Sequence, residues 1–111
     1  MSTIRIAVLV SGGGTNLQAI IDAQKAGILT SGKVELVVAD KKEAYALTRA
    51  EENNIKTRTL IRKDYVDIAS YSKAMRDALI EEKADLIVYA GFMTILDENV
   101  CDAFPNRMIN V

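Results

Sequence analysis

Residues 11–16, with the sequence SGGGTN, have the composition of a loop that binds an anion. They follow an apolar run and precede a helical pattern, so backbone N–H groups and the positive end of a helix would converge there. Glycines let the backbone approach a bound group closely. The loop predicts a phosphate site. A tight glycine turn without a ligand is the alternative, which its place after the first strand makes less favoured.

Two familiar phosphate motifs fit this loop poorly. A Walker A loop ends in Gly-Lys-Ser or Gly-Lys-Thr, and no lysine occurs before Lys25. The dinucleotide fingerprint GxGxxG needs a glycine where the chain has Leu17, although Asp40 follows the second apolar run, where an acid could bind a ribose. The first motif is excluded, and an NAD site is disfavoured.

Histidine is absent from all 111 residues. A general base in this chain would therefore have to be an Asp, Glu or Lys with a shifted pKa. Metal sites lose their commonest ligand as well, and we predict none. Either the chemistry avoids an imidazole, or its acid–base residues lie outside this sequence.

The elements that must position the loop alternate between strand and helix patterns. Continuous β-branched apolar runs predict buried strands, and apolar residues spaced by three and four predict helices. The alternation indicates one α/β domain with a doubly wound, mostly parallel sheet and right-handed crossovers. The predicted strands are 4–10, 34–39, 57–61, 85–90 and 108–111; the predicted helices are 16–26, 44–53 and 69–83, and a short segment, 95–104, precedes the last strand.

Composition excludes several classes of partner. Half of the residues are apolar and 26% are charged, as in a globular domain, and the net charge of −1 disfavours nucleic acid and anionic membranes. Cys101 is the only cysteine, so no intrachain disulfide can form. The sequence has no secretory or membrane-spanning apolar run, and we expect a cytoplasmic location.

Three stretches resemble the phosphoribosylglycinamide formyltransferases, a family of folate-dependent enzymes. SGGGTNLQAII resembles the family's S-G-x-G-[ST]-N-L-Q-A-[IL], and VYAGFMTIL (88–96) resembles its A-G-[FY]-M-x-[IL]-L. MINV (108–111) resembles the start of its [LM]-[IL]-N-[IV]-H-P-S. The resemblance runs from residue 4 to residue 111 and implies a Rossmann-like formyltransferase fold, truncated after about five strands.

The resemblance implies transfer of a formyl group from 10-formyltetrahydrofolate to the amine of 5-phosphoribosylglycinamide, in de novo purine biosynthesis. The ribose phosphate would be bound by Gly14, Thr15 and Asn16. The folate would lie on backbone groups and apolar walls of the segment after the fourth strand, near the first loop. The implied folate-binding residues are Met93, Thr94, Ile95, Leu96 and Asn110.

Asn110 also corresponds to the family's catalytic asparagine, whose amide polarises the formyl oxygen and stabilises the oxyanion that forms. The family's catalytic histidine and a later aspartate would lie beyond Val111. We therefore expect residues 1–111 to be the amino-terminal phosphate- and folate-binding part of the domain, inactive alone. The exposed last strand predicts self-association or complementation by a carboxyl-terminal half.

Three positions depart from the family's pattern. Thr94 stands where many relatives have a basic residue, Ile68 where a basic residue is often associated with the folate tail, and Asp40 where asparagine is common. If tail binding depends on side-chain charge, affinity would fall. Arg62 and Lys63 could compensate, although a solvated charge pair is the simpler interpretation.

The competing function is a non-catalytic α/β module that binds a nucleotide or a phosphate. A receiver-like domain of that kind would need an acidic cluster after the first strand, where Ser11 and Gly12 stand instead. Within the formyltransferases, methionyl-tRNA formyltransferase and formyltetrahydrofolate deformylase lack the SGGGTNLQ opening.

Overall fold

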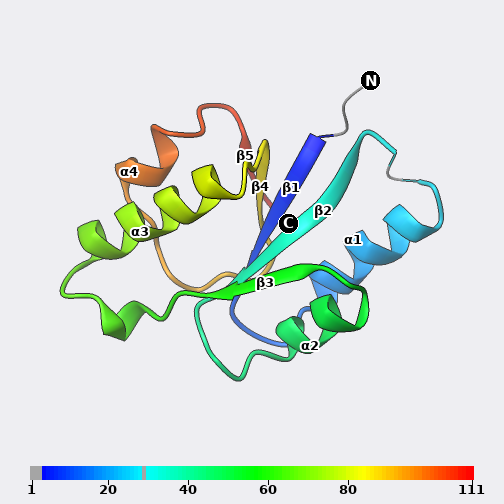
Figure 1. Cartoon of the computed structure of the whole chain (residues 1–111), viewed down its shortest axis with the longest axis horizontal. Coiled ribbons are helices and arrows are strands. Elements are labelled where there is room, and N and C mark those ends of the chain that lie inside the picture. Colours follow the sequence, from blue (N-terminus) through cyan, green and yellow to red (C-terminus); the bar gives the residue numbers. More distant parts are fainter. Residues whose placement is uncertain (1–3, 29) are drawn as a thin grey trace.

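Five parallel strands form one sheet within residues 4–28 and 30–111, the part of the chain that the computed structural model describes. Their order is β3-β2-β1-β4-β5, and helices connect them (Figure 1). The strands are β1 (Ile4–Val10), β2 (Gly32–Ala39), β3 (Lys56–Thr59), β4 (Leu86–Tyr89) and β5 (Met108–Asn110). The helices are α1 (Thr15–Lys25), α2 (Tyr45–Glu52), α3 (Ile68–Glu81) and α4 (Glu98–Cys101), with a 3₁₀ turn, η1 (Arg62–Asp64).

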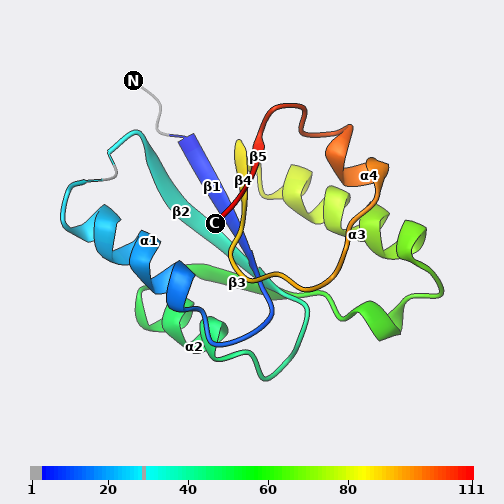
Figure 2. The same ribbon diagram turned by 180° about the vertical axis from the view of Figure 1, so that it is seen from behind.

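Helices cover both faces of the sheet. Figures 1 and 2 show α1 and α2 on one face and α3 and α4 on the other. Successive side chains of a strand point to opposite faces. Strand β1 therefore supplies Val8 and Val10 to the core under α1 and α2, and Ala7 and Leu9 to the core under α3 and α4. A sheet buried on both faces explains why the strands read as continuous apolar runs.

The predicted doubly wound α/β class is confirmed. Element ends differ from the predictions by one or two residues; for example, the third strand is β3 (Lys56–Thr59) rather than 57–61. The segment 95–104 contains α4, which has no long periodic pattern. This short helix is started by Asp97, whose carboxylate accepts a hydrogen bond from the Asn99 backbone N–H at 3.0 Å.

Strand β1 lies at the point where the winding of the sheet reverses. It pairs with β2 on one side and β4 on the other, with Leu9 opposite both Val38 and Tyr89. The carboxyl ends of these strands therefore lie at one edge of the sheet. In open α/β sheets this is the place where ligands bind.

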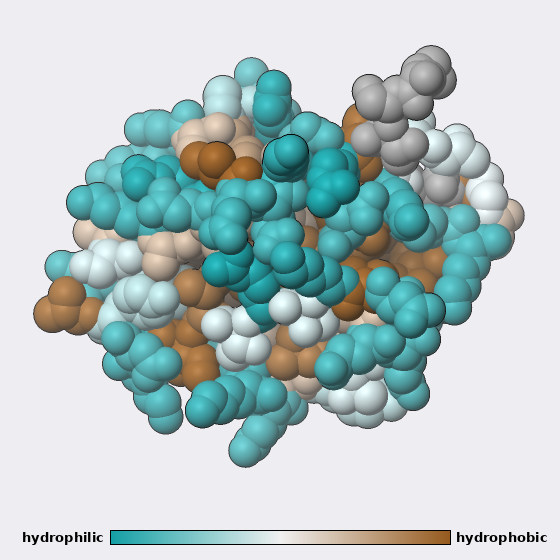
Figure 3. Space-filling model, in the orientation of Figure 1, coloured by the Kyte–Doolittle hydropathy of each residue, from teal (hydrophilic) through white to brown (hydrophobic). Residues whose placement is uncertain are grey.

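One face of the molecule is largely polar. The face in Figure 3 is mostly hydrophilic, and apolar side chains show through in small separate areas. Among the described helices, none combines the length and apolar character needed to cross a membrane.

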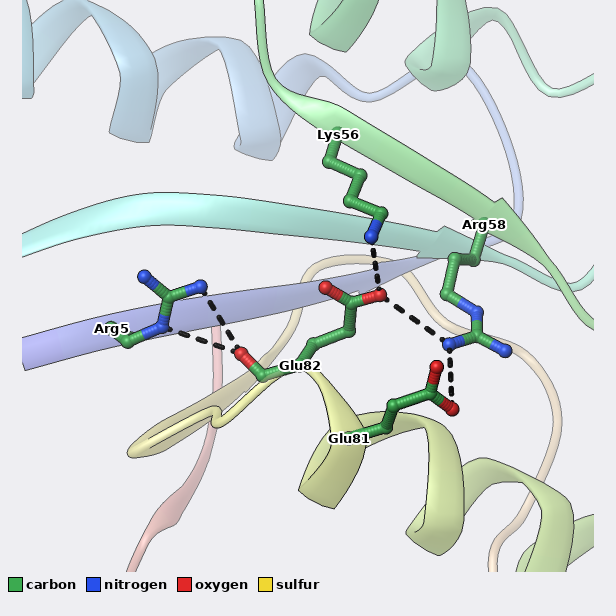
Figure 4. A network of polar contacts seen from close by, with 5 residues as sticks. All are labelled: Arg5, Lys56, Arg58, Glu81 and Glu82. Atoms are coloured by element: carbon green, nitrogen blue, oxygen red, sulfur yellow. Dashed lines mark hydrogen bonds and ion pairs between the residues drawn. The ribbon is translucent and has the colours of Figure 1, made fainter.

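An ion-pair network ties the opposite, amino-terminal edge together (Figure 4). The carboxylate of Glu82, just after α3, contacts Lys56 Nζ at 2.8 Å and Arg58 Nη1 at 3.4 Å. The guanidinium of Arg5 donates two hydrogen bonds to the Glu82 backbone carbonyl, at 3.2 and 3.3 Å. The network joins α3 to β1 and β3, and it places positive charge at the negative end of the helix.

Replacing Glu82 with glutamine should remove part of the pH dependence of stability. The hydrogen bond from Lys56 holds the pKa of the Glu82 carboxyl below its ordinary value. The resulting stability is present above the ordinary glutamate pKa of about 4.3 and is lost as the pH falls through the lowered folded-state pKa. We expect Glu82→Gln to cost about 1 kcal/mol near pH 7 and progressively less as the pH falls toward 3, by urea denaturation.

Glu81→Gln is the matched control, because the Glu81 carboxylate is 72% exposed and lies 3.6 Å from Arg58. It should change stability little at either pH. A Glu82→Gln protein with the same loss of stability at both pH values would show that the ion pairs of Glu82 contribute nothing.

Candidate functional site

The loop after β1 turns sharply at Gly14. This residue is the N-cap of α1 and has a φ of 77°, in the left-handed region that favours glycine. A side chain would also meet α2, because a Cβ built on Gly14 lies 2.6 Å from Ala46 Cβ. The glycine at this position is therefore required by both backbone conformation and packing.

Arg49 of α2 holds the loop in place. Its Nε donates a hydrogen bond to the Gly13 carbonyl at 2.7 Å, and its Nη1 donates one to the Gln18 side chain at 3.2 Å. Its guanidinium also lies over the Tyr45 ring, 4.9 Å from the centroid. Sequence reasoning missed Arg49, since an arginine in a helical pattern gives no signal of a partner 36 residues away.

The start of α1 is open to an anion. No side chain caps this helix, and its first turn carries no acidic residue. Thr15 and Asn16 form that first turn, and both are exposed. Backbone N–H groups without an intrahelical partner attract negative charge at such a position.

The segment after β4 lies against the loops that follow β1 and β2. The Met93 backbone N–H donates a hydrogen bond to Ser11 Oγ at 2.7 Å, and Thr94 Oγ1 donates one to Asp40 Oδ2 at 2.6 Å. The predicted neighbourhood of the first loop and the segment 93–96 is therefore confirmed. Two positions that depart from the family's pattern, Asp40 and Thr94, meet here.

Side chains of this segment alternate between solvent and the core. Phe92 and Leu96 are half-buried against the core on the α3 face, whereas Met93 and Ile95 are 74% and 84% exposed. Core packing thus accounts for the first pair only. Two large apolar side chains beside polar backbone groups form a surface that suits a flat, partly polar ring.

An open cleft of about 1200 Å³ lies at this edge. It brings together Met93 and Thr94 of the predicted site with Arg62 and Lys63, which come from η1. Its lining does not include the other predicted site residues, which are Gly14, Thr15, Asn16, Ile95, Leu96 and Asn110. Its lining residues are Ser11, Gly12, Gly13, Asp40, Lys41, Lys42, Glu43, Ala44, Tyr45, Ile61, Arg62, Lys63, Asp64, Met93 and Thr94.

Asn110 is the last residue of β5. It is exposed and lies opposite Tyr89, and the next backbone N–H, of Val111, donates to the Tyr89 carbonyl at 3.0 Å. Because β5 pairs with β4, Asn110 reaches the same edge as the segment 93–96. Burial raises the pKa of Tyr89 to about 12, so this phenol keeps its proton at neutral pH.

The remaining positions considered for the folate tail make contacts within the protein. Ile68 is half-buried against the α3-face core, and Arg62 Nη1 donates a hydrogen bond to the Tyr65 carbonyl at 3.2 Å. In the described parts of the chain, no three Cys, Asp or Glu side chains gather as metal ligands would.

Comparison with known proteins agrees with this geometry. Residues 4–111 match the family described as "Formyl transferase". The chain belongs to the formyl transferase family. The phosphoribosylglycinamide formyltransferase of Haemophilus influenzae is 38% identical over 107 residues, covering 96% of this chain and 50% of that protein. The Escherichia coli enzyme of the same name is 36% identical over 108 residues, covering 97% and 50%.

Solved formyl transferase structures share the fold. Glycinamide ribonucleotide transformylase 1 from Symbiobacterium toebii superposes with a TM-score of 0.92 at 36% identity, covering 97% of this chain and 50% of that chain. The chain thus spans about half the length of the relatives it matches. Formyl transferase membership accounts for the parallel sheet and for the loop order along it.

Replacing Gly14 with alanine should destabilise the protein by about 2 kcal/mol, because the left-handed backbone and the contact with Ala46 both oppose a Cβ. Gly13→Ala is the matched control, since a Cβ there meets nothing within 4 Å. Urea denaturation measures both. Equal effects of the two substitutions would contradict this account of the turn.

Proposed function

We propose that this chain is the phosphate- and folate-binding part of an enzyme that formylates 5-phosphoribosylglycinamide, with 10-formyltetrahydrofolate as donor, in purine biosynthesis. The single observation that carries the proposal is the contact of the glycine loop with the segment after β4, through Ser11 and Met93. This contact brings an anion-binding loop and an apolar, partly polar segment to one edge. Membership of the formyl transferase family supports the reaction class.

The substrate phosphate is assigned to the start of α1. Gly14, Thr15 and Asn16 supply backbone N–H groups and a hydroxyl at an uncapped helix end without nearby carboxylates in its first turn. The cleft is lined by four basic residues, Lys41, Lys42, Arg62 and Lys63, and by three acidic residues, Asp40, Glu43 and Asp64. Their net positive charge favours ligands with phosphate or carboxylate groups.

The folate is assigned to residues 93–96 and to Asn110. Exposed Met93 and Ile95 provide apolar contact area, and backbone groups of Thr94 and Leu96 provide donors and acceptors along one edge of the ring. The formyl group would then lie toward the end of β5. Asn110 is exposed there and can donate its amide to the formyl oxygen.

The reaction needs a stabilised oxyanion. The amine lone pair attacks the formyl carbon, forming a C–N bond and a tetrahedral intermediate with negative charge on oxygen. Collapse breaks the bond to the folate nitrogen, and the proton lost by the amine goes to that nitrogen. Asn110 stabilises the oxyanion. The sequence holds no histidine to carry the proton, and we assign that step to residues outside these 111.

A phosphate- or nucleotide-binding module without catalysis is the second candidate. The open start of α1 favours it as much as it favours the enzyme. It would need neither Asn110 nor the exposed apolar pair of the segment 93–96. Activity in the presence of a carboxyl-terminal half separates the two functions.

The chain alone should give no formyl transfer above background, because it has no histidine to carry the proton. Mixing it with the separately produced carboxyl-terminal half of the Escherichia coli relative should restore turnover, since β5 offers an unpaired edge. Turnover is measured by deformylation of 10-formyltetrahydrofolate with and without the glycinamide substrate. Robust turnover by the chain alone, or none with the added half, would overturn the proposed division of labour.

Asn110→Ala in the restored enzyme should lower kcat by about 10²- to 10³-fold and change KM little, because an oxyanion contact acts chiefly in the transition state. Asn99→Ala on α4 is the matched control and should leave kcat near the unsubstituted value. A loss of less than threefold on Asn110→Ala would remove Asn110 from the oxyanion role.

A further inference from the structure

Two consecutive residues of the segment after β4 are hydrogen-bonded to the residues that follow two adjacent strands. The Met93 backbone N–H is bonded to Ser11, which follows β1, and the Thr94 hydroxyl is bonded to Asp40, which follows β2. Both acceptors are buried, with exposed fractions of 3% and 6%. The segment leads from β4 toward α4 (Figure 1), and these two hydrogen bonds tie it to the sheet edge.

These hydrogen bonds matter because the part of the segment between Phe92 and Leu96 has little packing of its own. Met93 and Ile95 are exposed, so their side chains contribute almost nothing to holding the backbone. The two bonds are short, at 2.7 and 2.6 Å.

Burying the Asp40 side chain costs more stability than its single hydrogen bond returns. Its Oδ1 is buried and finds no hydrogen-bond partner within the described part of the chain, and no ion pair to it occurs there. A buried carboxylate with one bonded oxygen is disfavoured relative to a neutral side chain of the same shape. Stability alone therefore does not explain an acid at this place.

We propose that Asp40 is a positioning residue, which sets the backbone of residues 93–96 through Thr94, with Ser11 as the second anchor. The inference rests on the proposed function, in which this segment receives the folate. Backbone groups recognise a rigid ring only when they are held at fixed spacing before the ring arrives. Asp40 and Thr94 together supply that restraint, in place of a direct charge contact with the ligand.

Thr94→Val tests the restraint, because it keeps the shape of the side chain and removes the hydroxyl. Hydrogen exchange of the Met93 amide, which is bonded to Ser11 Oγ, should become about tenfold faster, while exchange in β1 and β2 stays unchanged. Thr94→Ser keeps the hydroxyl and should restore slow exchange. Thr48→Val, on the exposed side of α2, is the matched control.

Substitutions of Asp40 separate charge from hydrogen bonding. Asp40→Asn keeps an acceptor oxygen for Thr94, so exchange of the Met93 amide should stay slow and the melting temperature should not fall. Asp40→Ala removes the acceptor and should match Thr94→Val. If Asp40→Ala fails to fold, the comparison of Thr94→Val with Thr94→Ser still decides the question.

Titration with 5-formyltetrahydrofolate, a stable folate, links the restraint to the ligand. Binding should weaken about tenfold in Thr94→Val and recover in Thr94→Ser. Faster exchange in a protein whose unsubstituted form binds no folate would support the restraint and count against the proposed function. Unchanged exchange in Thr94→Val, or faster exchange with unchanged folate affinity, would overturn the positioning role.

Discussion

Parallel pairing around β1 is the constraint on which the rest of the structure depends. Every strand of the described sheet runs in the same direction, and β1 has a neighbour on each side, so the loops after β1, β2 and β4 must emerge together. Ser11 and Asp40 each follow the last residue of a strand, and both side chains therefore meet the segment that leaves β4. The site is a consequence of topology before it is a consequence of any one residue.

The two edges of the sheet carry different kinds of polar group. At the amino-terminal edge, Glu82 is matched by Lys56 and Arg58, and the charges there satisfy one another (Figure 4). At the carboxyl-terminal edge, the start of α1 is uncapped and Asp40 retains an oxygen without a partner in the described chain. Satisfied groups stabilise a fold, and unsatisfied ones are kept where a ligand or a function uses them.

Sequence patterns predicted the parts of the fold that depend on local composition. The apolar runs of β1, β2 and β4 and the glycine loop are written in consecutive residues, so their place and order follow from the chain. The bond between Asp40 and Thr94 spans 54 residues and depends on strand order and on which face each side chain takes, neither of which a single position records. Exposure of Met93 and Ile95 was hidden for a similar reason, because apolar residues after a strand ordinarily pack inward.

Helix α2 shapes the phosphate loop without lining the start of α1. Ala46 closes the space beside Gly14, the Ala46 backbone N–H donates to the Gly12 carbonyl at 3.1 Å, and Arg49 holds the Gly13 carbonyl. A left-handed residue persists only where its surroundings determine it from several sides. The carbonyls of Gly12 and Gly13 are thus both hydrogen-bonded to α2. The conformation of the loop is therefore fixed by the helix that follows the next strand, which supports the proposed phosphate site.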